Sequence, residues 1–261
     1  MSEILLEVDR LEMRFGGLIA LQEVSFVAHR GLITSVIGPN GAGKTTLINC
    51  ITGMYSATSG RVMFAGRELT RLAPHQIARC GIGRTFQNIA LFDGLTVLDN
   101  LKLGAYQRGR SGLLEGAFML PAARREEAEA DRRAREILDL IGLSDVANKT
   151  PTELSYGTQK QVEFARALMQ DARMIFLDEP MAGMSRAEKA RFMDLIQRVR
   201  ASLGLSFLLV EHDMPVIMGI SDHIVVLDFG RKIAEGPPAE ISRNEAVIAA
   251  YLGNDLAEAH A

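Results

Sequence analysis

The sequence predicts an α/β fold: a mostly parallel sheet flanked by helices, an antiparallel β-subdomain at the N-terminus and an inserted α-helical subdomain. Three patterns predict it. After Pro151, short apolar runs alternate with amphipathic helical stretches, which is the order of a parallel sheet. The first 37 residues alternate apolar and polar positions, as antiparallel strands do. Between about 88 and 154 the pattern becomes helical.

The N-terminal strands come first. "ILLEVDRLEMRF" and "ALQEVSFVA" flank a turn at Gly16-Gly17. The next run, "GLITSVI", is apolar without a break, which is typical of a strand covered on both faces. It leads through a glycine-rich loop into "KTTLINCITGM", which we expect to be a helix. Residues 61–70 have the pattern of another short strand and turn.

The helical block and the second half follow. In "RREEAEADRRAREILDLIGL", apolar side chains recur at helical spacing, and Gly142 is placed to end the helix. "MIFLDEP" (174–180) and "FLLVEHD" (207–213) are apolar runs that end in acids, with a helix between them. "HIVVLDFGRKIAEGPP" predicts two strands around Gly230, then a short helix and a polar tail. The apolar stripe of the helix predicted in "RREEAEADRRAREILDLIGL" consists of Ala134, Ile137, Leu138 and Ile141.

Composition excludes several classes of protein. The 261 residues are 48% apolar, enough for a sizeable core, and carry a net charge of −3 from 29 basic and 32 acidic side chains. Broad nucleic-acid binding requires a basic excess, so we expect no nucleic-acid partner. Cys50 and Cys80 lack metal-ligand spacing, which favours a reduced cytosolic setting. With no signal peptide and no apolar run of bilayer length, we expect a soluble chain that a partner holds at any membrane.

Residues 38–45, "GPNGAGKT", match G-x-x-x-x-G-K-[ST], the phosphate-binding P-loop, between a predicted strand and a predicted helix. Glycines let the backbone turn so that successive N–H groups point at an anion, and the helix start adds its positive end. Lys44 is placed to reach the β- and γ-phosphates, and Thr45 to ligate Mg²⁺. A chance match is the alternative, and the flanking strand and helix argue against it. The segment predicts nucleotide binding.

Two acids end the run "MIFLDEP". Ligands of open α/β sheets sit at the carboxyl ends of the strands, which places Asp178 to hold Mg²⁺ through water and Glu179 to orient or deprotonate a water. Alone, such a pair is more often a solvated turn; beside a P-loop it indicates catalysis. Gln87 in "TFQN" and His212 in "FLLVEHD" indicate nothing alone, since single residues of these types usually belong to the scaffold.

The stretch "LSYGTQKQVEFARALM" begins with a Ser-x-Gly turn that opens an amphipathic helix. Such a helix start is a second preformed anion site. The alternative is an ordinary helix with Ser155 as its N-cap. The local pattern does not decide between the two.

Five segments, "GPNGAGKTT", "TFQN", "LSYGTQ", "MIFLDEP" and "VEHD", occur in the order and spacing of ATP-binding cassette (ABC) ATPases, and the sequence resembles that family over nearly its whole length. "RFGGLIAL", "GIGRTFQNIALFDGLTVLDNL" and the ending "VIAAYLG" are similar to ATPase subunits of branched-chain amino acid importers. The resemblance implies a single ABC ATPase domain over 1–261. Its P-loop NTPase core would comprise 1–87 and 155–261, and its inserted helical subdomain 88–154.

The resemblance also implies a mode of action. Two cassettes, identical or paralogous, would pack head to tail, so that the turn at 155–157 of one closes over the γ-phosphate held by the other's P-loop. ATP and Mg²⁺ are the expected cofactors. Hydrolysis would drive two integral membrane permease subunits, docked on the helical subdomain at the cytoplasmic face of the inner membrane. A periplasmic or extracellular solute-binding protein would deliver branched-chain or related amino acids.

Single residues receive roles from the same resemblance. Phe15 would stack on adenine, and Gln87 would sense Mg²⁺ and the γ-phosphate. Glu179 would be the general base, while His212 would contact the γ-phosphate and the attacking water. The expected catalytic residues are Glu179, His212 and Gln87, and the expected metal ligands are Thr45, Gln87 and Asp178. The expected nucleotide-binding residues are Phe15, Gly38, Pro39, Asn40, Gly41, Ala42, Gly43, Lys44, Thr45, Thr46, Ser155 and Gly157.

The sequence departs from the family pattern in three places. The signature commonly reads L-S-G-G-Q, and this chain has Tyr156 and Thr158 at its third and fifth positions. Phe15 stands where Tyr is more frequent. The loop "MAGMS" lacks the Asp that many cassettes carry near Ser185, which weakens any expectation about how two sites communicate.

Other functions compete with this one. An importer for urea, amides or aromatic acids would carry the same motifs. A soluble P-loop kinase explains the P-loop and Asp178 but leaves "LSYGTQ" without a role. Cassettes that act on DNA or ribosomes usually have a coiled-coil insertion or two fused cassettes, whereas this chain shows one cassette without sustained heptads. "DFG" at 228–230 and "CGIGRTF" lack the context of kinase and dinucleotide motifs.

Overall fold

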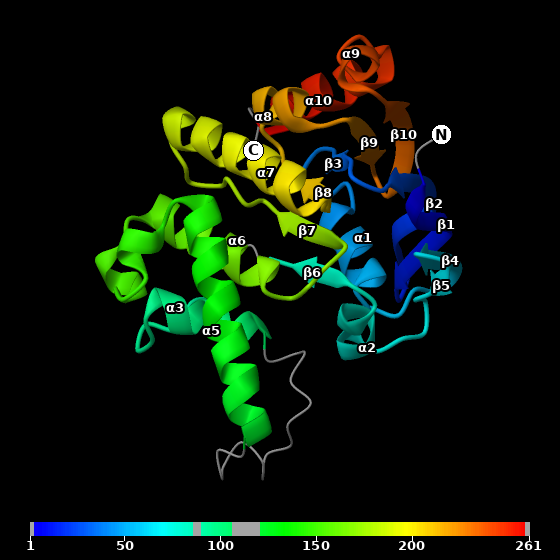
Figure 1. Cartoon of the computed structure of the whole chain (residues 1–261). Coiled ribbons are helices and arrows are strands. Elements are labelled where there is room, and N and C mark those ends of the chain that lie inside the picture. The colour runs from blue at the N-terminus through cyan, green and yellow to red at the C-terminus, as the bar shows by residue number, and fades with distance from the viewer. Residues whose placement is uncertain (1–2, 86–89, 106–120, 259–261) are drawn as a thin grey trace.

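The computed structural model describes residues 3–85, 90–105 and 121–258. Its N-terminal strands form a four-stranded antiparallel sheet in the order β2-β1-β4-β5 (Figure 1). A glycine turn at Gly16, with φ +59°, joins the first two strands as predicted. The bounds are β1 (Ile4–Phe15), β2 (Leu18–His29), β4 (Ser59–Phe64) and β5 (Arg67–Glu68).

A second, six-stranded sheet has the order β10-β9-β3-β8-β7-β6. Its strands pair in parallel except at β9 and β10, which are antiparallel. Every residue of β3 is buried, which confirms the expectation of a strand covered on both faces, and every residue of β7 and β8 is buried as well. The predicted α/β fold is confirmed. The bounds are β3 (Ile33–Ile37), β6 (Ile82–Arg84), β7 (Met174–Asp178), β8 (Ser206–Val210), β9 (His223–Asp228) and β10 (Arg231–Gly236).

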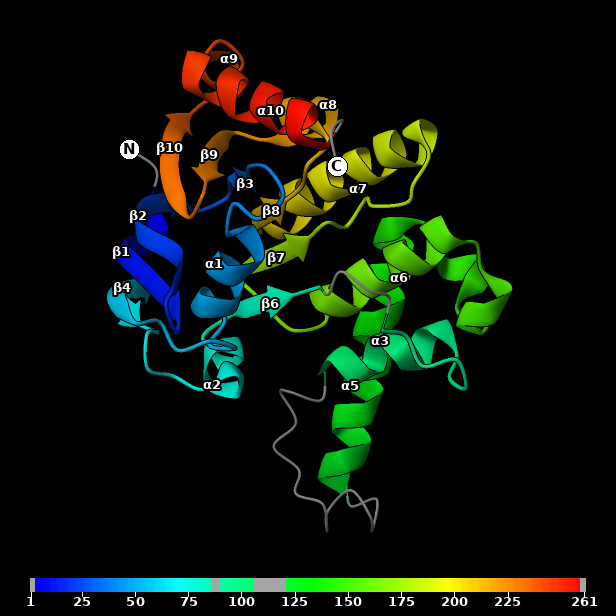
Figure 2. The same ribbon diagram turned by 180° about the vertical axis from the view of Figure 1, so that it is seen from behind.

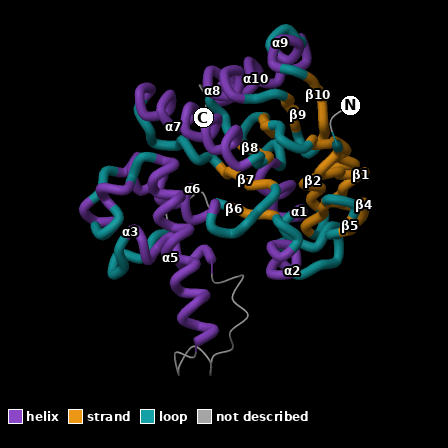
Figure 3. Tube along the Cα trace, in the orientation of Figure 1, coloured by secondary structure: helices purple, strands orange, loops and turns teal. Residues whose placement is uncertain are grey.

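The two faces of the parallel sheet have different covers. Alternate side chains of a strand point to opposite faces, so Phe176 of β7 packs with α1 (Lys44–Ile51) and the antiparallel sheet. Its neighbour Leu177 packs with α7 (Arg186–Leu203) and the helical block. Figure 3 shows the antiparallel strands and most of the helices on opposite sides of the molecule.

The helical block contains α3 (Val97–Ala105), α5 (Pro121–Ile141), α6 (Tyr156–Leu168) and 3₁₀ turns at Ser144–Val146 and Pro151–Glu153. In it, α3 packs against both α5 and α6. Gly142, with φ +75°, follows α5 as predicted. The predicted domain division assigns α6 to the core, and that division stays a prediction. All four side chains of the predicted stripe are buried: Ala134, Ile137, Leu138 and Ile141.

Three segments differ from expectation. No sequence pattern predicts α2 (Pro74–Arg79) or the three-residue β6, which pairs with β7 alone and therefore depends on its partner rather than on local propensity. The C-terminal segment was expected to be a short helix and a polar tail. It forms α9 (Pro238–Ile241) and then α10 (Glu245–Glu258), whose Val247 and Tyr251 pack in a cluster with Ile37. The polar-tail prediction was wrong because these apolar side chains give α10 a buried face.

Within the described residues one further helix, α8 (Met214–Ile220), lies between β8 and β9 in the chain and packs against α7 and α9. None of the helices in the described ranges is long and apolar enough to cross a membrane.

Candidate active site

The predicted P-loop connects β3 to α1, and two of its glycines are required by neighbouring backbone. Gly38 has φ +150°, and a Cβ there would lie 2.1 Å from the carbonyl oxygen of Leu227. Gly43 has φ +99°, and its Cβ would lie 2.8 Å from the carbonyl oxygen of Ala20. Gly41 has φ +79° with no atom within 4 Å of an added Cβ. At Gly38 and Gly43 the loop therefore packs closely against β9 and β2. This packing requires glycine at both positions, in addition to any requirement of phosphate binding.

Lys44 is the first residue of α1, and its ammonium lies over this loop. Nζ donates to the carbonyl oxygens of Gly38, at 2.6 Å, and Pro39, at 2.8 Å. Burial lowers the pKa of Lys44, while the carboxylates of Glu179 and Asp178 raise it. The side chain is thus fixed at the loop and faces the acids at the end of β7.

The rest of the P-loop alternates between core and surface. Pro39 and Ala42 are buried, whereas Asn40 and Thr45 are exposed and Thr46 is half-buried. The carbonyl oxygen of Ala42 accepts from the N–H of Gly230 at 3.0 Å, so the turn between β9 and β10 also supports the loop.

Asp178 ends β7 and is 4% exposed. Burial raises the pKa of its carboxyl group, and the guanidinium of Arg84 opposes this. Nη2 of Arg84 lies 3.2 Å from Oδ2 of Asp178, and Nη1 donates to Oδ1 of Asn49 at 2.8 Å and to Oγ1 of Thr52 at 3.2 Å. Arg84 thus links β6, the helix that follows the P-loop and the end of β7. The sequence did not predict a role for Arg84, because an arginine on a three-residue strand has no pattern of its own.

Glu179 and His212 meet at the ends of two adjacent strands. Oε1 of Glu179 lies 3.9 Å from Nδ1 of His212, and the two side chains are 24% and 57% exposed. The backbone of Glu179 has φ +47°, an uncommon left-handed conformation for a residue with a side chain and one that clusters at functional sites. The structure therefore brings together the two residues predicted to act on water.

The predicted signature turn opens α6. Ser155 is exposed and is the N-cap of α6: its Oγ accepts from the N–H of Thr158 at 3.3 Å. Gly157 is buried, and a Cβ there would lie 2.8 Å from Oε1 of Glu188. The ordinary N-cap at Ser155, which the sequence allowed as the alternative to a second anion site, is therefore present. Figures 1 and 2 show β6 and β7 between α6 and the P-loop helix α1.

The predicted adenine contact lies at the end of β1. Phe15 is 43% exposed, and its ring meets that of Tyr55 edge to face, with centroids 5.3 Å apart at 85°. Tyr55 follows α1 in the chain and was not anticipated. Gln87, the predicted γ-phosphate sensor, lies outside the residues that the structure describes.

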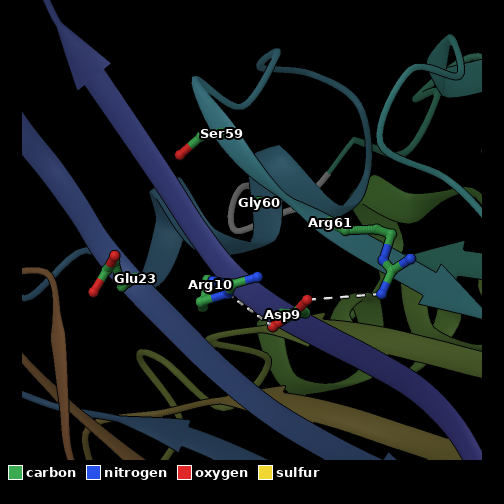
Figure 4. A pocket seen from close by; sticks show the side chains of 6 residues that line it. All are labelled: Asp9, Arg10, Glu23, Ser59, Gly60 and Arg61. Carbon is green, nitrogen blue, oxygen red and sulfur yellow. Dashed lines mark ion pairs between the residues drawn. The ribbon is translucent and has the colours of Figure 1, made fainter.

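A separate hollow lies on the antiparallel sheet (Figure 4). Asp9 pairs there with Arg10, at 3.5 Å, and with Arg61, at 3.7 Å. None of the predicted nucleotide-binding residues lines it. The lining consists of Asp9, Arg10, Glu23, Ser59, Gly60 and Arg61.

A P-loop between a parallel strand and its helix, with acids at the end of a nearby strand, defines a P-loop nucleoside triphosphatase. Comparison with known proteins narrows the class. Residues 21–182 match the family model described as ABC transporter, and residues 231–257 match the model described as branched-chain amino acid ATP-binding cassette transporter. The chain therefore belongs to the ABC transporter family, whose cassettes are ATPases.

Curated relatives agree over almost the full length. The chain is 44% identical to the high-affinity branched-chain amino acid transport ATP-binding protein BraF of Pseudomonas aeruginosa, over 97% of this chain and 99% of that protein. It is 43% identical to LivG of Escherichia coli K12, a protein of the same description, with the same coverage.

Solved structures confirm the cassette fold. The ADP conformation of MJ1267, an ATP-binding cassette of an ABC transporter, matches with a TM-score of 0.85 and 34% identity, over 97% of this chain and all (100%) of that one. A dimeric, post-hydrolysis structure of the ATP-binding cassette MJ0796 bound to ADP and Pi matches with a TM-score of 0.74 and 25% identity, over 89% and 98% of the two chains.

Proposed function

We propose that the chain is the ATP-hydrolysing subunit of an ABC importer for branched-chain or related amino acids. Its C-terminal match and its curated relatives support this class of solute. The alternatives raised by the sequence, an importer for urea, amides or aromatic acids and a soluble kinase, are not favoured by these relatives.

In this proposal the P-loop binds the phosphates of ATP. The backbone N–H groups within 38–46, of which Pro39 has none, would surround them, and Lys44 would exchange its two carbonyl partners for phosphate oxygens. The hydroxyl of Thr45 and the carboxylate of Asp178 are hard oxygen donors of the kind that Mg²⁺ prefers, with Gln87 as a further ligand. Mg²⁺ bound there would neutralise charge on the phosphate oxygens. Phe15, supported by Tyr55, would stack on adenine.

Hydrolysis then depends on the pair at the ends of β7 and β8. Glu179 would take a proton from the attacking water as general base, because its carboxylate lies at the site and is partly open to solvent. His212, 3.9 Å away, would contact the same water and the γ-phosphate.

The placement of α6 carries the proposal of a shared site. In both views β6 and β7 lie between α6, the helix that Ser155 caps, and the P-loop helix α1 of the same chain. Ser155 is exposed and can meet another subunit. A second cassette, identical or paralogous, would therefore supply the donors that close over the γ-phosphate.

The remaining partners follow from the transport role. Two integral membrane permease subunits would bind the helical subdomain, residues 88–154, and hold the cassette at the cytoplasmic face of the inner membrane. A periplasmic or extracellular solute-binding protein would act on the other side. ATP would drive closure by binding the closed pair of cassettes more tightly than the open one.

Mixing two inactive variants tests the shared site. Lys44→Ala and Ser155→Arg chains are each expected to be inactive, and mixing them restores hydrolysis because one of the two sites then combines an intact Lys44 with an intact Ser155. Each variant mixed with itself is the control. Sites contained within a single chain would remain inactive after mixing.

Reconstitution tests the solute. The cassettes, permeases and binding protein in lipid vesicles are expected to take up leucine when ATP is supplied on the cassette side, and leucine should stimulate hydrolysis. Urea, acetamide and phenylalanine serve as comparisons. Stimulation by one of these and not by leucine would replace the proposed solute.

A further inference from the structure

Glu211 stands between β8 and His212, and only 1% of it is exposed. Its two carboxylate oxygens accept from two different backbone N–H groups. Oε1 accepts from Met181 at 3.0 Å, and Oε2 accepts from His212 at 3.3 Å. Met181 belongs to the loop that carries Glu179. One buried carboxylate therefore joins the two loops that hold the proposed catalytic residues.

This contact extends the pairing of β7 and β8 beyond the sheet. The parallel register of the two strands ends at Asp178 and Val210. The N–H of Glu179 then donates to the carbonyl oxygen of Val210 at 2.9 Å. The following link, from Met181, goes to the side chain of Glu211 instead of a backbone carbonyl. The carboxylate thus fixes one loop against the other where strand pairing has stopped.

The other side of His212 is fixed as well. Oδ1 of Asp213 accepts from the N–H of Val216 at 3.3 Å and caps α8. Its Oδ2 pairs with Nζ of Lys189 on α7. His212 therefore stands between two anchored acids, and only its own side chain is left largely exposed.

A carboxylate suits this position better than other side chains. Two converging N–H groups need two acceptor oxygens, and a glutamine would supply one oxygen and turn its NH₂ toward the second N–H. Burial raises the pKa of Glu211, and the nearby Glu179 carboxylate raises it further, whereas the N–H groups of Met181 and His212 lower it. Burying a carboxylate is costly unless its oxygens are hydrogen-bonded, and here both oxygens accept backbone N–H groups.

We propose that Glu211 is a positioning residue for ATP hydrolysis, which holds the Glu179 loop against the His212 loop so that the base and the histidine face the same water. The proposal rests on the roles proposed above for Glu179 and His212. Glu211 itself touches neither ATP nor water in this account. Its loss should therefore slow the chemical step and leave ATP binding intact.

Two variants of the full-length chain test this, with kcat and the Kd for ATP as separate readouts. Glu211→Ala removes both acceptors and should lower kcat about 100-fold, the loss that a misplacement of about 1 Å causes. Glu211→Gln keeps one acceptor and should lose roughly tenfold, while the Kd of both variants stays within about twofold of wild type. Should the alanine variant fail to fold, the glutamine variant decides.

Glu235→Gln is the matched control. Glu235 is a partly buried glutamate on β10 that pairs with His223 at 3.0 Å, away from the two loops. Its substitution removes a paired charge and should leave kcat unchanged. A wild-type kcat for Glu211→Gln, or a kcat loss equal to that of Glu235→Gln, would overturn the positioning role.

A double-mutant cycle separates the positioning role proposed for Glu211 from the catalytic role proposed for Glu179. In a Glu179→Gln background, adding Glu211→Gln should change the residual rate by less than about twofold, because residues that act as one unit are not additive. A full further loss would show that Glu211 acts independently of Glu179. Unimpaired hydrolysis by Glu179→Gln alone would refute the catalytic role of Glu179, whatever Glu211 does.

Discussion

Oε1 of Glu179 lies 3.9 Å from Nδ1 of His212, although the two residues follow different strands of the sheet. The parallel pairing of β7 with β8 sets this distance, because the strands end in register at Asp178 and Val210. Replacing Glu179 by Gln keeps the shape and removes the base. Steady-state hydrolysis should fall by about 10²- to 10⁴-fold, the usual contribution of a general base, while ATP remains bound.

Gel filtration of the Glu179→Gln variant tests whether ATP that is bound and not hydrolysed holds two cassettes together. With ATP and Mg²⁺, the Glu179→Gln chain should elute as a larger species, since ATP would stay between two cassettes. With ADP in place of ATP, the same variant should elute later, at the volume of a single chain. A monomer under both conditions would count against the shared site.

Lys44→Ala should abolish ATP binding. The ammonium of Lys44 is held over the P-loop by two carbonyl oxygens, where phosphate oxygens would meet it. Lys102→Ala is the control: Lys102, on α3, pairs with Asp99 at 3.4 Å and should not affect affinity. Calorimetric titration with ATP measures both. An unchanged affinity in Lys44→Ala would refute the role of this lysine.

Arg84→Met should destabilise the fold, because the buried carboxylate of Asp178 loses its hydrogen-bonded guanidinium partner. Breaking one side of a buried ion pair costs about 3–5 kcal/mol. Urea unfolding measures the loss. Adding Asp178→Asn should recover part of it, since the uncompensated charge is then gone. A change below about 0.5 kcal/mol in Arg84→Met, the range of ordinary surface substitutions, would contradict this assignment.

Gly38 and Gly41 offer a matched pair of substitutions. Both have positive φ, so alanine is strained at either position, by somewhat more than about 1 kcal/mol. Only at Gly38 does the new methyl meet backbone, at 2.1 Å from the oxygen of Leu227. Gly38→Ala should therefore lower the midpoint of thermal unfolding well below that of Gly41→Ala. Equal midpoints would show that the P-loop can move away from β9.

The two cysteines should differ in reactivity. Burial raises the pKa of Cys50 from 9.0 to about 11, whereas Cys80 is only half-buried. At pH 8 roughly one part in a thousand of the Cys50 thiol would be ionised, so a maleimide should label Cys80 first. The unfolded thiol ionises before the folded one, so this group's contribution to stability is present below pH 9 and is lost as pH rises toward 11. Fast labelling of Cys50 in native protein would contradict its burial.

The sequence predicted the strands and helices whose apolar spacing is regular, such as β3, β7 and α5. It predicted Glu179 and His212 as partners only through resemblance, because a lone histidine after a strand has no physical signature. Arg84 and Glu211 were missed for a related reason. Their roles come from contacts with β7 and its loop, and such contacts exist only once the parallel sheet has brought distant segments together.

The most direct measurement is a structure of the Glu179→Gln chain with ATP and Mg²⁺. We expect two subunits, with Ser155 and Gly157 of one against the γ-phosphate that Lys44 of the other binds. A structure in which ATP and Mg²⁺ fill the P-loop while Ser155 and Gly157 of every subunit face bulk solvent would contradict the account.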